Sequence, residues 1–377
     1  MIAARKLRKL WRRLSDMHPG LMGLIMLLSA YGILMQYSAS GGEWSGFAVQ
    51  HASKWAMGMV MCLCVALLPG RVLFALSYLV YLGCLGLLGL VEVIGEQGGG
   101  AQRWLNLGVA TVQPSELMKI GLIVALARYF HAANLEGSRH YIVLIAPLIM
   151  LGMPAALILL QPNLGTATIL VLIAGTIAFM AGIRGWYFGS VIGLVAAAIP
   201  ILYQFLHPYQ QKRVMTFLDP ESDPLGAGYN IIQSKIAIGS GGFFGKGLLE
   251  GSQGQLDFLP EKQTDFIFTM VAEELGFLGA FVLLVFYGLL LWYGMMLMLR
   301  CRHQYGRMLA AGVVALFTVH IFINMAMVMG MLPVVGVPLP FLSYGGSFLM
   351  TTLLACGLLL HVDLTRDDRL PRHQSIG

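Results

Sequence analysis

Long apolar stretches separated by short polar ones run along most of this chain. Ten of them approach the roughly 20 apolar residues that a helix needs to cross about 30 Å of hydrocarbon. They lie near residues 19–38, 52–68, 73–94, 115–131, 141–160, 165–183, 187–206, 265–299, 308–330 and 342–362. The pattern predicts an all-α, polytopic membrane protein with about ten transmembrane helices, folded as a single domain over residues 1–377.

The longest polar interval separates the seventh span from the eighth. It covers residues 207–263, and its 57 positions hold five Lys/Arg, six Asp/Glu and nine Gly. Ordinary connections between helices have about 2–8 residues, and a much longer one in a compact protein is usually functional or disordered. Apolar runs between the glycines, such as Phe243-Phe244, argue against disorder. We therefore expect an ordered outer loop that carries function.

Composition supports a membrane protein and sets its orientation. Charged residues make up 11% of the chain, against about 25% in soluble domains. With ten spans both termini lie on one side, which carries 16 of the 24 Lys and Arg residues. The excess of basic residues on cytoplasmic sides places both termini in the cytoplasm and the 207–263 loop outside. The net charge of +6 then reflects topology and contact with anionic lipids, not nucleic-acid binding.

Asp265 lies where the long loop returns to the membrane. Thr264 is expected to cap the helix that follows, which would put Asp265 in its first turn. The positive helix end would lower the pKa of this carboxyl, and the neighbouring apolar side chains would raise it. Asp265 either stabilises the helix start or is a general base poised by these opposing effects. Its place at the end of a flexible outer loop makes a base chemically plausible.

Glu116 and Lys119 open the fourth span, after Gln113. They are three positions apart, so they share one helix face and can form an ion pair, while Ser115 or Thr111 could cap the helix. Ionisable groups at the rim of a span are costly and are candidates for function. Two interpretations stay open: a structural pair that pins the helix end, or groups that contact a substrate.

Two further polar features lie on the outer half of the spans. Glu273 and Glu274 are adjacent and point in different directions, so they cannot both line one cavity, and bonding to neighbouring helices is the favoured interpretation. Residues 330–347 hold three prolines and four glycines, which cannot continue a helix. This stretch is either a rigid turn or a phosphate- and sugar-binding segment that uses backbone N–H groups and the hydroxyls of Ser343 and Tyr344.

Basic residues expected on the outer side suit an anionic ligand. They are Arg103, Lys119, Arg213, Lys235 and Lys262. Arginine forms bidentate contacts with phosphate and lysine supplies a point charge, so a cavity holding them would bind the doubly anionic head group of a lipid. The five cysteines show neither zinc-ligand spacing nor a paired pattern, so we expect no disulfide and no metal cluster.

Taken together, these motifs resemble the SEDS family (shape, elongation, division, sporulation). The resemblance extends from about Ser38 to Ser347 and is densest in GAQRW, QPSE, QPNLG, FLDPESDPLGAGYNIIQSKIAIGSGG, TDFIF and PLPFLSYGGS. Within the family, the run LPVVGVPLP is closer to the RodA branch, the rod-shape-determining proteins, than to the FtsW branch of cell division.

The resemblance implies a peptidoglycan glycosyltransferase of the bacterial inner membrane that polymerises lipid II into glycan strands on the outer face during elongation. It implies that Asp265 is the essential aspartate of the family and that Glu116 and Lys119 are its functional pair. It also implies a class B penicillin-binding protein as obligate partner, beside other membrane proteins of elongation. The chain departs from the family pattern at Asn163, where aspartate is common, and at His51, where a basic residue is common.

The implied reaction displaces undecaprenyl pyrophosphate from the anomeric carbon of the lipid-linked glycan. Asp265 would take the proton of the acceptor hydroxyl, and a single carboxylate fits an inverting transferase. Basic side chains, with a labile Mg²⁺ or Mn²⁺ carried by the substrate, would stabilise the pyrophosphate. The alternatives are a lipid II flippase, which should contact the head group through the full membrane, and a non-catalytic scaffold, which leaves Asp265 unexplained.

Overall fold

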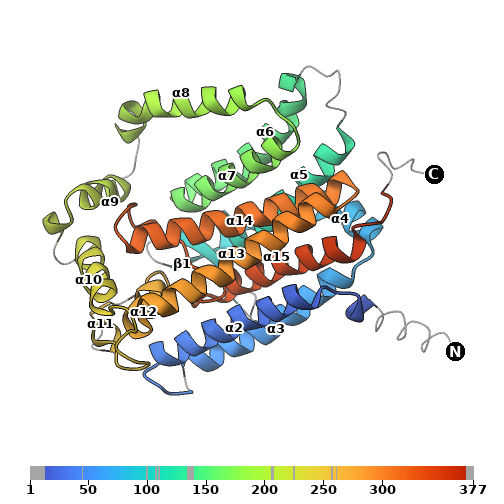
Figure 1. Ribbon diagram of the computed structural model, residues 1–377. Coiled ribbons are helices and arrows are strands. Elements are labelled where there is room, and N and C mark those ends of the chain that lie inside the picture. The colour runs from blue at the N-terminus through green and yellow to red at the C-terminus, as the bar shows by residue number, and fades with distance from the viewer. Residues whose placement is uncertain are drawn as a thin grey trace.

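The computed structural model describes residues 13–370, except positions 45, 99–100, 107, 109–110, 134–139, 205–207, 224–225, 256–257 and 260. Helices make up most of it (Figure 1). Helices of 17–25 residues coincide with the predicted spans: α2 (Pro19–Ala39), α3 (Phe47–Leu67), α4 (Gly70–Ile94), α5 (Pro114–Ala132), α6 (His140–Leu160), α7 (Leu164–Met180), α8 (Gly185–Gln204), α13 (Gly276–Arg300), α14 (Gln304–Val328) and α15 (Gly346–Thr365). Six of them are long and apolar enough to cross a membrane, and α7 and α8 are shorter apolar helices. The all-α membrane fold is confirmed, while ten crossings remain a prediction.

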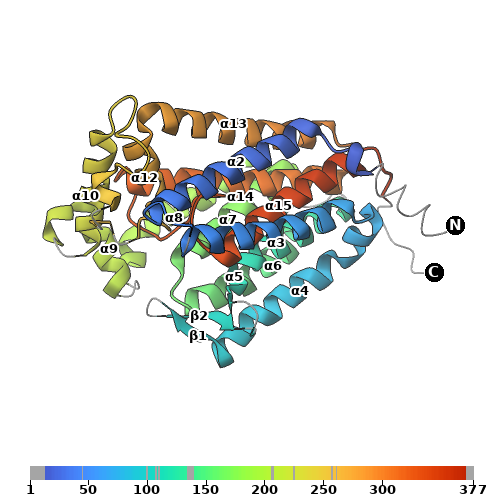
Figure 2. The same cartoon turned by 90° about the horizontal axis from the view of Figure 1, so that it is seen from below.

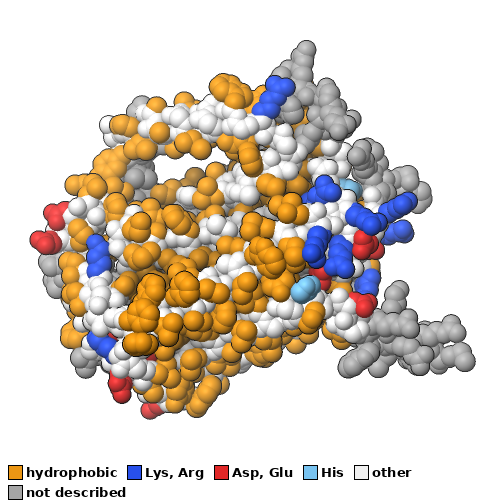
Figure 3. Space-filling view, viewed as in Figure 1, with side chains coloured by type: hydrophobic (Ala, Val, Ile, Leu, Met, Phe, Trp, Pro, Cys, Tyr) orange, Lys and Arg blue, Asp and Glu red, His pale blue; other side chains and the backbone are white. Residues whose placement is uncertain are grey.

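Charged side chains gather at the ends of the bundle, and hydrophobic ones cover its long face (Figure 3). At one end the N–H of His18 donates to Asp363 Oδ2 at 3.0 Å, and Arg13 Nη1 donates to the carbonyl of Leu67 at 2.9 Å. These bonds join the start of α2 to the ends of α3 and α15. The helices of the long segment lie at the opposite end (Figure 1 and Figure 2). One end of the bundle therefore holds the start of α2 and the end of α15, and the other end holds the long segment, as the predicted topology requires.

Three helices form the centre of the bundle. In the most apolar 18-residue stretch of each helix, 83% of the residues of α15 and 72% of those of α14 are buried, but only 17% of those of α6. Helix α5 is buried along most of its length, although it carries Glu116 and Lys119. These two charges therefore lie in the middle of the fold, where an unpaired charge is costly.

A small antiparallel sheet interrupts the helices. Its strands are β1 (Glu96–Gly98), β2 (Ala101–Asn106) and β3 (Thr111–Val112), in the order β1-β2-β3. Glu96 pairs with Trp104 across the first two strands. These strands were not predicted from the sequence. Strand β2 packs against α4 and α5 and brings Arg103 to the site described below.

The described parts of the 207–263 segment are folded. They contain α9 (Pro208–Leu218), the 3₁₀ turn η1 (Pro220–Ser222), α10 (Ala227–Ser240) and α11 (Ser252–Gln255), and α12 (Ile267–Glu274) follows. Helix α10 packs against α12 and α14, and Ser234 Oγ donates to the carbonyl of Val328 at 2.8 Å. These contacts hold the segment against the end of the bundle, in keeping with the expectation of an ordered loop.

An interruption of the helix divides the predicted span 265–299 in two. Helix α12 ends at Glu274 and α13 begins at Gly276, so only α13 has the length of a span. Gly276 has a φ of +66°, which residues with a side chain seldom adopt. A Cβ there would lie 2.2 Å from the backbone nitrogen of Gly245. The prediction of one continuous helix was wrong because the long segment docks against the backbone at this point.

Gly276→Ala is expected to destabilise the protein, because it adds a Cβ where neither the backbone conformation nor the space accepts one. The free energy of unfolding should fall by about 1–3 kcal/mol. Gly288→Ala in α13 is the control, since a Cβ there meets nothing within 4 Å. Thermal unfolding of both variants in detergent measures the difference. Equal unfolding midpoints would show that the break tolerates a side chain.

Candidate active site

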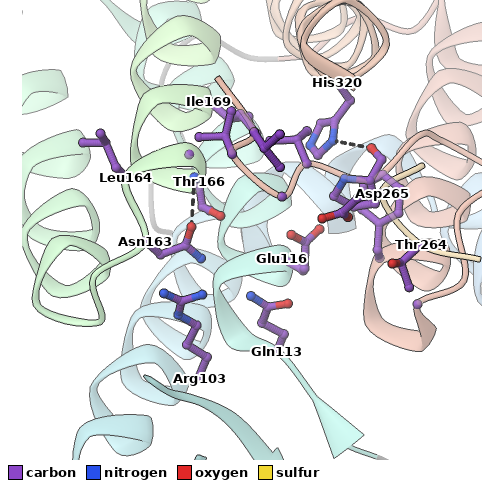
Figure 4. Close-up of a pocket in the computed structure, with 18 of the residues that line it drawn as sticks. Arg103, Gln113, Glu116, Asn163, Leu164, Thr166, Ile169, Thr264, Asp265 and His320 are labelled. Carbon is purple, nitrogen blue, oxygen red and sulfur yellow. Dashed lines mark hydrogen bonds between the residues drawn. The ribbon is translucent and has the colours of Figure 1, made fainter. Parts of the chain in front are cut away.

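A cavity of about 870 Å³ collects polar residues that are far apart in the sequence. Its walls come from β2, the first turns of α5 and α7, α9, the turn before α12, α14 and the irregular segment between α14 and α15. The acidic, basic and imidazole side chains on these walls are those of Arg103, Glu116, Lys119, Arg213, Glu261, Asp265 and His320. In Figure 4, Arg103, Glu116 and Asp265 approach the same space from three different elements.

Most of the predicted site residues meet in this cavity. Asp265, Glu116, Lys119, Arg103, Arg213 and Tyr344 line it. Lys235 and Ser343 are not among the described lining residues. Lys235 packs against Gly330, where an added Cβ would lie 2.3 Å from its Cε. Ser343 Oγ accepts the N–H of Leu339 at 2.7 Å and donates to the carbonyl of Thr264 at 2.6 Å, so it holds two backbone segments together.

Asp265 lies in a turn and not inside a helix. Helix α12 begins at Ile267 with Phe266 as N-cap, and no acidic residue lies in its first turn. The prediction that Thr264 caps the helix was wrong, because its Oγ1 donates to Glu261 Oε2 at 2.6 Å. Asp265 therefore lines the cavity from irregular backbone, before the helix starts.

The surroundings of Asp265 favour its protonated form. Burial, with a further contribution from the Glu261 carboxylate, raises the pKa of Asp265 from 3.8 to about 6, and the Arg213 guanidinium opposes the rise. The sequence had suggested that a helix end lowers the pKa of Asp265. In the structure the positive charge that lowers it is Arg213 instead. A carboxyl whose pKa lies near neutral pH is suited to accept a proton during a reaction.

Glu116 and Lys119 form a buried ion pair at the start of α5. Lys119 Nζ donates to Glu116 Oε1 at 2.8 Å. Glu116 Oε2 lies at the same distance from this nitrogen but makes no hydrogen bond, and His320 Nε2 is 3.0 Å from it. Neither predicted cap is used, because Gln113 is the N-cap and makes no side-chain cap bond. The pair is a structural contact and also part of the cavity wall, so the two interpretations are compatible.

The irregular segment at residues 329–345 forms one wall of the cavity. Its carbonyls bond side chains from four helices: Gln36 with Leu342 (2.7 Å), His51 with Phe341 (3.0 Å), Tyr287 with Pro340 (2.5 Å) and Asn324 with Val337 (2.8 Å). Broken backbone persists at membrane depth when protein groups satisfy it in this way. The segment is therefore a rigid turn that also lines the cavity. The hydroxyl of Tyr344 bonds Gln50 and, at 3.0 Å, Lys54 Nζ.

Arg103 is held by the turn between α6 and α7. Its Nε donates to the carbonyl of Gln161 at 3.0 Å, and its Nη2 donates to that of Pro162 at 2.9 Å. Asn163 caps α7, because its Oδ1 accepts the N–H of Thr166 at 3.2 Å (Figure 4). The departure from the family pattern at Asn163 therefore falls on a helix cap, for which a neutral amide suffices.

Glu273 and Glu274 point in different directions, as predicted, and neither is among the lining residues of the described chain. The Glu274 carboxylate accepts the hydroxyl of Ser38 at 2.6 Å. Glu273 Oε1 accepts from Lys246 Nζ at 2.7 Å and from the N–H of Gln253 at 3.0 Å. These bonds tie α2 and the long segment to α12, which supports the structural interpretation.

Lys246→Met is expected to loosen the long segment from the bundle. Glu273 is 1% exposed, so loss of its partner leaves a buried carboxylate short of a hydrogen bond, at a cost of about 1–3 kcal/mol. Lys212→Met is the matched control, because Lys212 pairs with Asp223 at 3.1 Å but its side chain is 65% exposed. The rate of limited proteolysis within residues 241–262 measures the effect. Equal cleavage of the two variants would contradict this anchoring role.

Metal-ligand clusters are absent from the part of the chain that the structure describes. No group of three or more His, Cys, Asp or Glu there is placed to hold a metal ion. The five cysteines are unpaired. Glu116 pairs with Lys119 instead, and the Arg213 guanidinium acts on Asp265.

Three residues at the site were not predicted from the sequence. His320 contacts Lys119, Asn324 contacts the backbone of Asp265, and Glu261 lines the cavity beside it. His320 did carry a signal, because an ionisable residue inside an apolar span is a candidate for function. Asn324 and Glu261 carried none, since their roles depend on which segments fold against them.

Fold and site together define a polytopic membrane protein with a charged cavity inside a helical bundle. A family model for FtsW, RodA and SpoVE, described as cell cycle proteins, matches residues 14–368. The chain belongs to this family, as the sequence motifs predicted.

Relatives and solved structures show which members of the family this chain is similar to. The peptidoglycan glycosyltransferase MrdB of Escherichia coli K12 is 43% identical over 353 residues, which cover 92% of this chain and 94% of the relative. A chain from a peptidoglycan synthase complex, described as coordinating polymerization and crosslinking, matches with a TM-score of 0.81 at 33% identity, over 94% of this chain and 99% of that one. The rod shape determining protein RodA of Thermus thermophilus matches with a TM-score of 0.71 at 29% identity, over 94% and 98%. The similarity to the RodA branch is confirmed.

Proposed function

We propose that this protein is a peptidoglycan glycosyltransferase that polymerises lipid II into glycan strands during cell elongation. The names of the MrdB relative and of the peptidoglycan synthase complex support this activity. The observation that carries the proposal is one cavity that holds Asp265, with its pKa raised to about 6, beside the basic residues Arg103, Lys119 and Arg213. Transfer of a sugar from a pyrophosphate donor needs a base and cationic groups of this kind.

Asp265 is the general base of an inverting displacement in this proposal. It takes the proton of the 4-hydroxyl of the acceptor sugar while that oxygen bonds to the anomeric carbon of the lipid-linked glycan. The bond from this carbon to the phosphate oxygen breaks, and undecaprenyl pyrophosphate leaves with the electron pair. An α-linked phosphate becomes a β-glycosidic bond, so one carboxylate suffices and no covalent intermediate forms.

Arg103, Arg213 and Lys119 stabilise the pyrophosphate as charge develops on it. A divalent cation, Mg²⁺ or Mn²⁺, would arrive bound to the pyrophosphate, because the described residues offer no set of three metal ligands. Tyr344 adds a hydroxyl at the cavity wall. Glu116 is the counter-charge of Lys119 in its buried position, 2.8 Å away.

The proposed setting is the inner membrane of a bacterium, with both termini in the cytoplasm and the cavity toward the periplasm. The excess of basic residues predicted on the side of the termini supports this orientation. A class B penicillin-binding protein is the proposed partner, and the synthase complex that coordinates polymerization with crosslinking supports it. Other membrane proteins of elongation and the surrounding lipids complete the setting.

Purified protein in complex with its transpeptidase, given labelled lipid II in vesicles, tests the proposal. Glycan polymer formed without any added glycosyltransferase is the expected result. Movement of lipid II between leaflets without polymer would replace the enzyme by a flippase. Neither polymer nor movement, with the transpeptidase bound, would leave a scaffold.

The rate of polymerisation should depend on pH through Asp265. Because the pKa of this carboxyl is raised to about 6, the basic form is lost as pH falls, and the rate should drop about tenfold per pH unit below pH 6. An unshifted aspartate would keep its basic form down to about pH 4. Arg213→Gln should move the drop to higher pH, since the guanidinium opposes the rise of the pKa. A flat profile between about pH 5 and 7 would contradict this assignment.

A further inference from the structure

His320, on α14, lies between the ion pair of α5 and the irregular segment. Its Nε2 is 3.0 Å from Lys119 Nζ. Its Nδ1 is 3.2 Å from the carbonyl oxygen of Pro338, and the dashed line at His320 in Figure 4 marks this contact. The side chain is almost entirely buried, and its ring packs against Phe348. Each ring nitrogen therefore has a defined partner.

These two contacts determine which ring nitrogen of His320 carries the proton. A carbonyl oxygen only accepts, so Nδ1 donates to Pro338. Nε2 then presents its lone pair and accepts an N–H from the Lys119 ammonium. His320 is neutral in this arrangement, because a second proton on Nε2 would face the ammonium at 3.0 Å.

The ammonium of Lys119 is oriented by two acceptors. It has three N–H donors, and Glu116 lies at 2.8 Å and His320 at 3.0 Å from its nitrogen. The end of a lysine side chain otherwise rotates freely. The two acceptors therefore set the direction of the third N–H, the one left for an anion in the cavity that Lys119 lines.

The same face of α14 also reaches the base. Asn324 follows His320 by four residues, so the two side chains share one helix face. Asn324 Nδ2 donates to the carbonyl of Asp265 at 2.9 Å. One rigid helix therefore sets the positions of a cation and a carboxylate that come from different parts of the chain.

We propose that His320 is a positioning residue for glycosyl transfer, a role that rests on the function proposed above. By accepting one N–H of Lys119, it directs the remaining N–H to the pyrophosphate leaving group and keeps the ammonium from turning wholly toward Glu116. By donating to Pro338, it ties Lys119 to the cavity wall beside Asp265. His320 touches no reacting atom and acts through Lys119.

A histidine with two buried bonds could instead serve only to pack α14 against the irregular segment. The two roles depend on different bonds: packing on the bond to Pro338, and positioning on the bond to Lys119. Substitution by asparagine or glutamine separates them. The amide of asparagine is as many bonds from Cα as Nδ1, and that of glutamine as many as Nε2, so each retains one of the two contacts.

The experiment compares kcat and KM for lipid II in His320→Gln, His320→Asn and the parental protein, each in complex with the transpeptidase. His320→Gln should keep kcat within about 3-fold of the parental value. His320→Asn should lower kcat by about 10- to 100-fold, the worth of one hydrogen bond to a charged group, with little change in KM, because the missing contact acts in the transition state. Thermal unfolding midpoints establish that both variants are folded.

Tyr287→Phe is the matched control for the irregular segment. Its hydroxyl bonds the carbonyl of Pro340 at 2.5 Å from the α13 side, and Tyr287 is not among the described residues that line the cavity. This variant should lose stability while keeping the parental kcat.

The proposal is overturned if His320→Asn matches or exceeds His320→Gln in kcat, or if His320→Gln loses activity as a folded protein. It is also overturned if Tyr287→Phe lowers kcat as much as His320→Asn, since the effect would then come from the segment and not from Lys119. A parental protein that makes no polymer would instead contradict the proposed function, so the two failures are distinguishable.

Discussion

Asp265→Asn is expected to lower the rate of lipid II polymerisation by about 10²–10⁴ while the protein stays folded and abundant in the membrane. The amide has the size of the carboxylate but cannot take the proton of the acceptor hydroxyl. Asn324 holds Asp265 through its backbone carbonyl at 2.9 Å, a bond that the substitution keeps. Asp265 also precedes α12, so no helix cap is lost. The expected loss is therefore chemical and not structural.

Polymerisation of labelled lipid II by the complex with the transpeptidase measures this loss. Asp219→Asn is the matched control, because Asp219 is an exposed aspartate of the same long segment whose side chain caps no helix. It should keep the parental rate. Polymer from Asp265→Asn at a near-parental rate would exclude Asp265 as the base and leave Glu116 and Glu261 as the other carboxylates of the cavity.

Exchange of Glu116 and Lys119 is expected to give a folded protein that does not polymerise lipid II. Glu116→Lys with Lys119→Glu keeps opposite charges three residues apart on α5, so a buried pair can still form. The ammonium, however, moves away from His320, which lies 3.0 Å from it in the parental protein. A pair that only pins the helix would work in either order, whereas groups that contact the substrate would not.

The single variants Glu116→Gln and Lys119→Met provide the reference for this exchange. Each leaves one charge buried without its partner, at an expected cost of about 3–5 kcal/mol. The unfolding midpoint should recover in the double variant, while its polymerisation rate stays at least about 100-fold below the parental rate. Recovery of rate together with stability would make the pair purely structural.

Local sequence was sufficient for the helical framework of this protein. A helix that crosses a bilayer must satisfy its own backbone and present about 20 apolar residues, so its signal lies within one stretch of chain. The break between α14 and α15 was visible for a similar reason, because Pro333, Pro338 and Pro340 cannot continue a helix. These features need no knowledge of what packs beside them.

The errors fall where a distant segment decides the local structure. The span predicted over residues 265–299 contained no proline at position 275 or 276, yet it breaks there because Gly245 of the long segment occupies the space beside Gly276. Thr264 has the side chain of a helix cap, but it bonds Glu261 in a turn. Strand β2 exists because it pairs with β1 and β3, and no apolar alternation marks it.

The sequence by itself determined the membrane fold, the family and the residue types of the candidate site, including Asp265, Glu116 and Lys119. Only the tertiary structure decided which polar residues share the cavity. Lys235 and Ser343 are not among its described lining residues, whereas His320 is. A membrane span forms because one continuous stretch of apolar residues is buried in lipid, so neighbouring residues in the sequence are enough to predict it. A site depends on the directions in which separate helices present single side chains, and packing between α5, α14 and the irregular segment sets those directions.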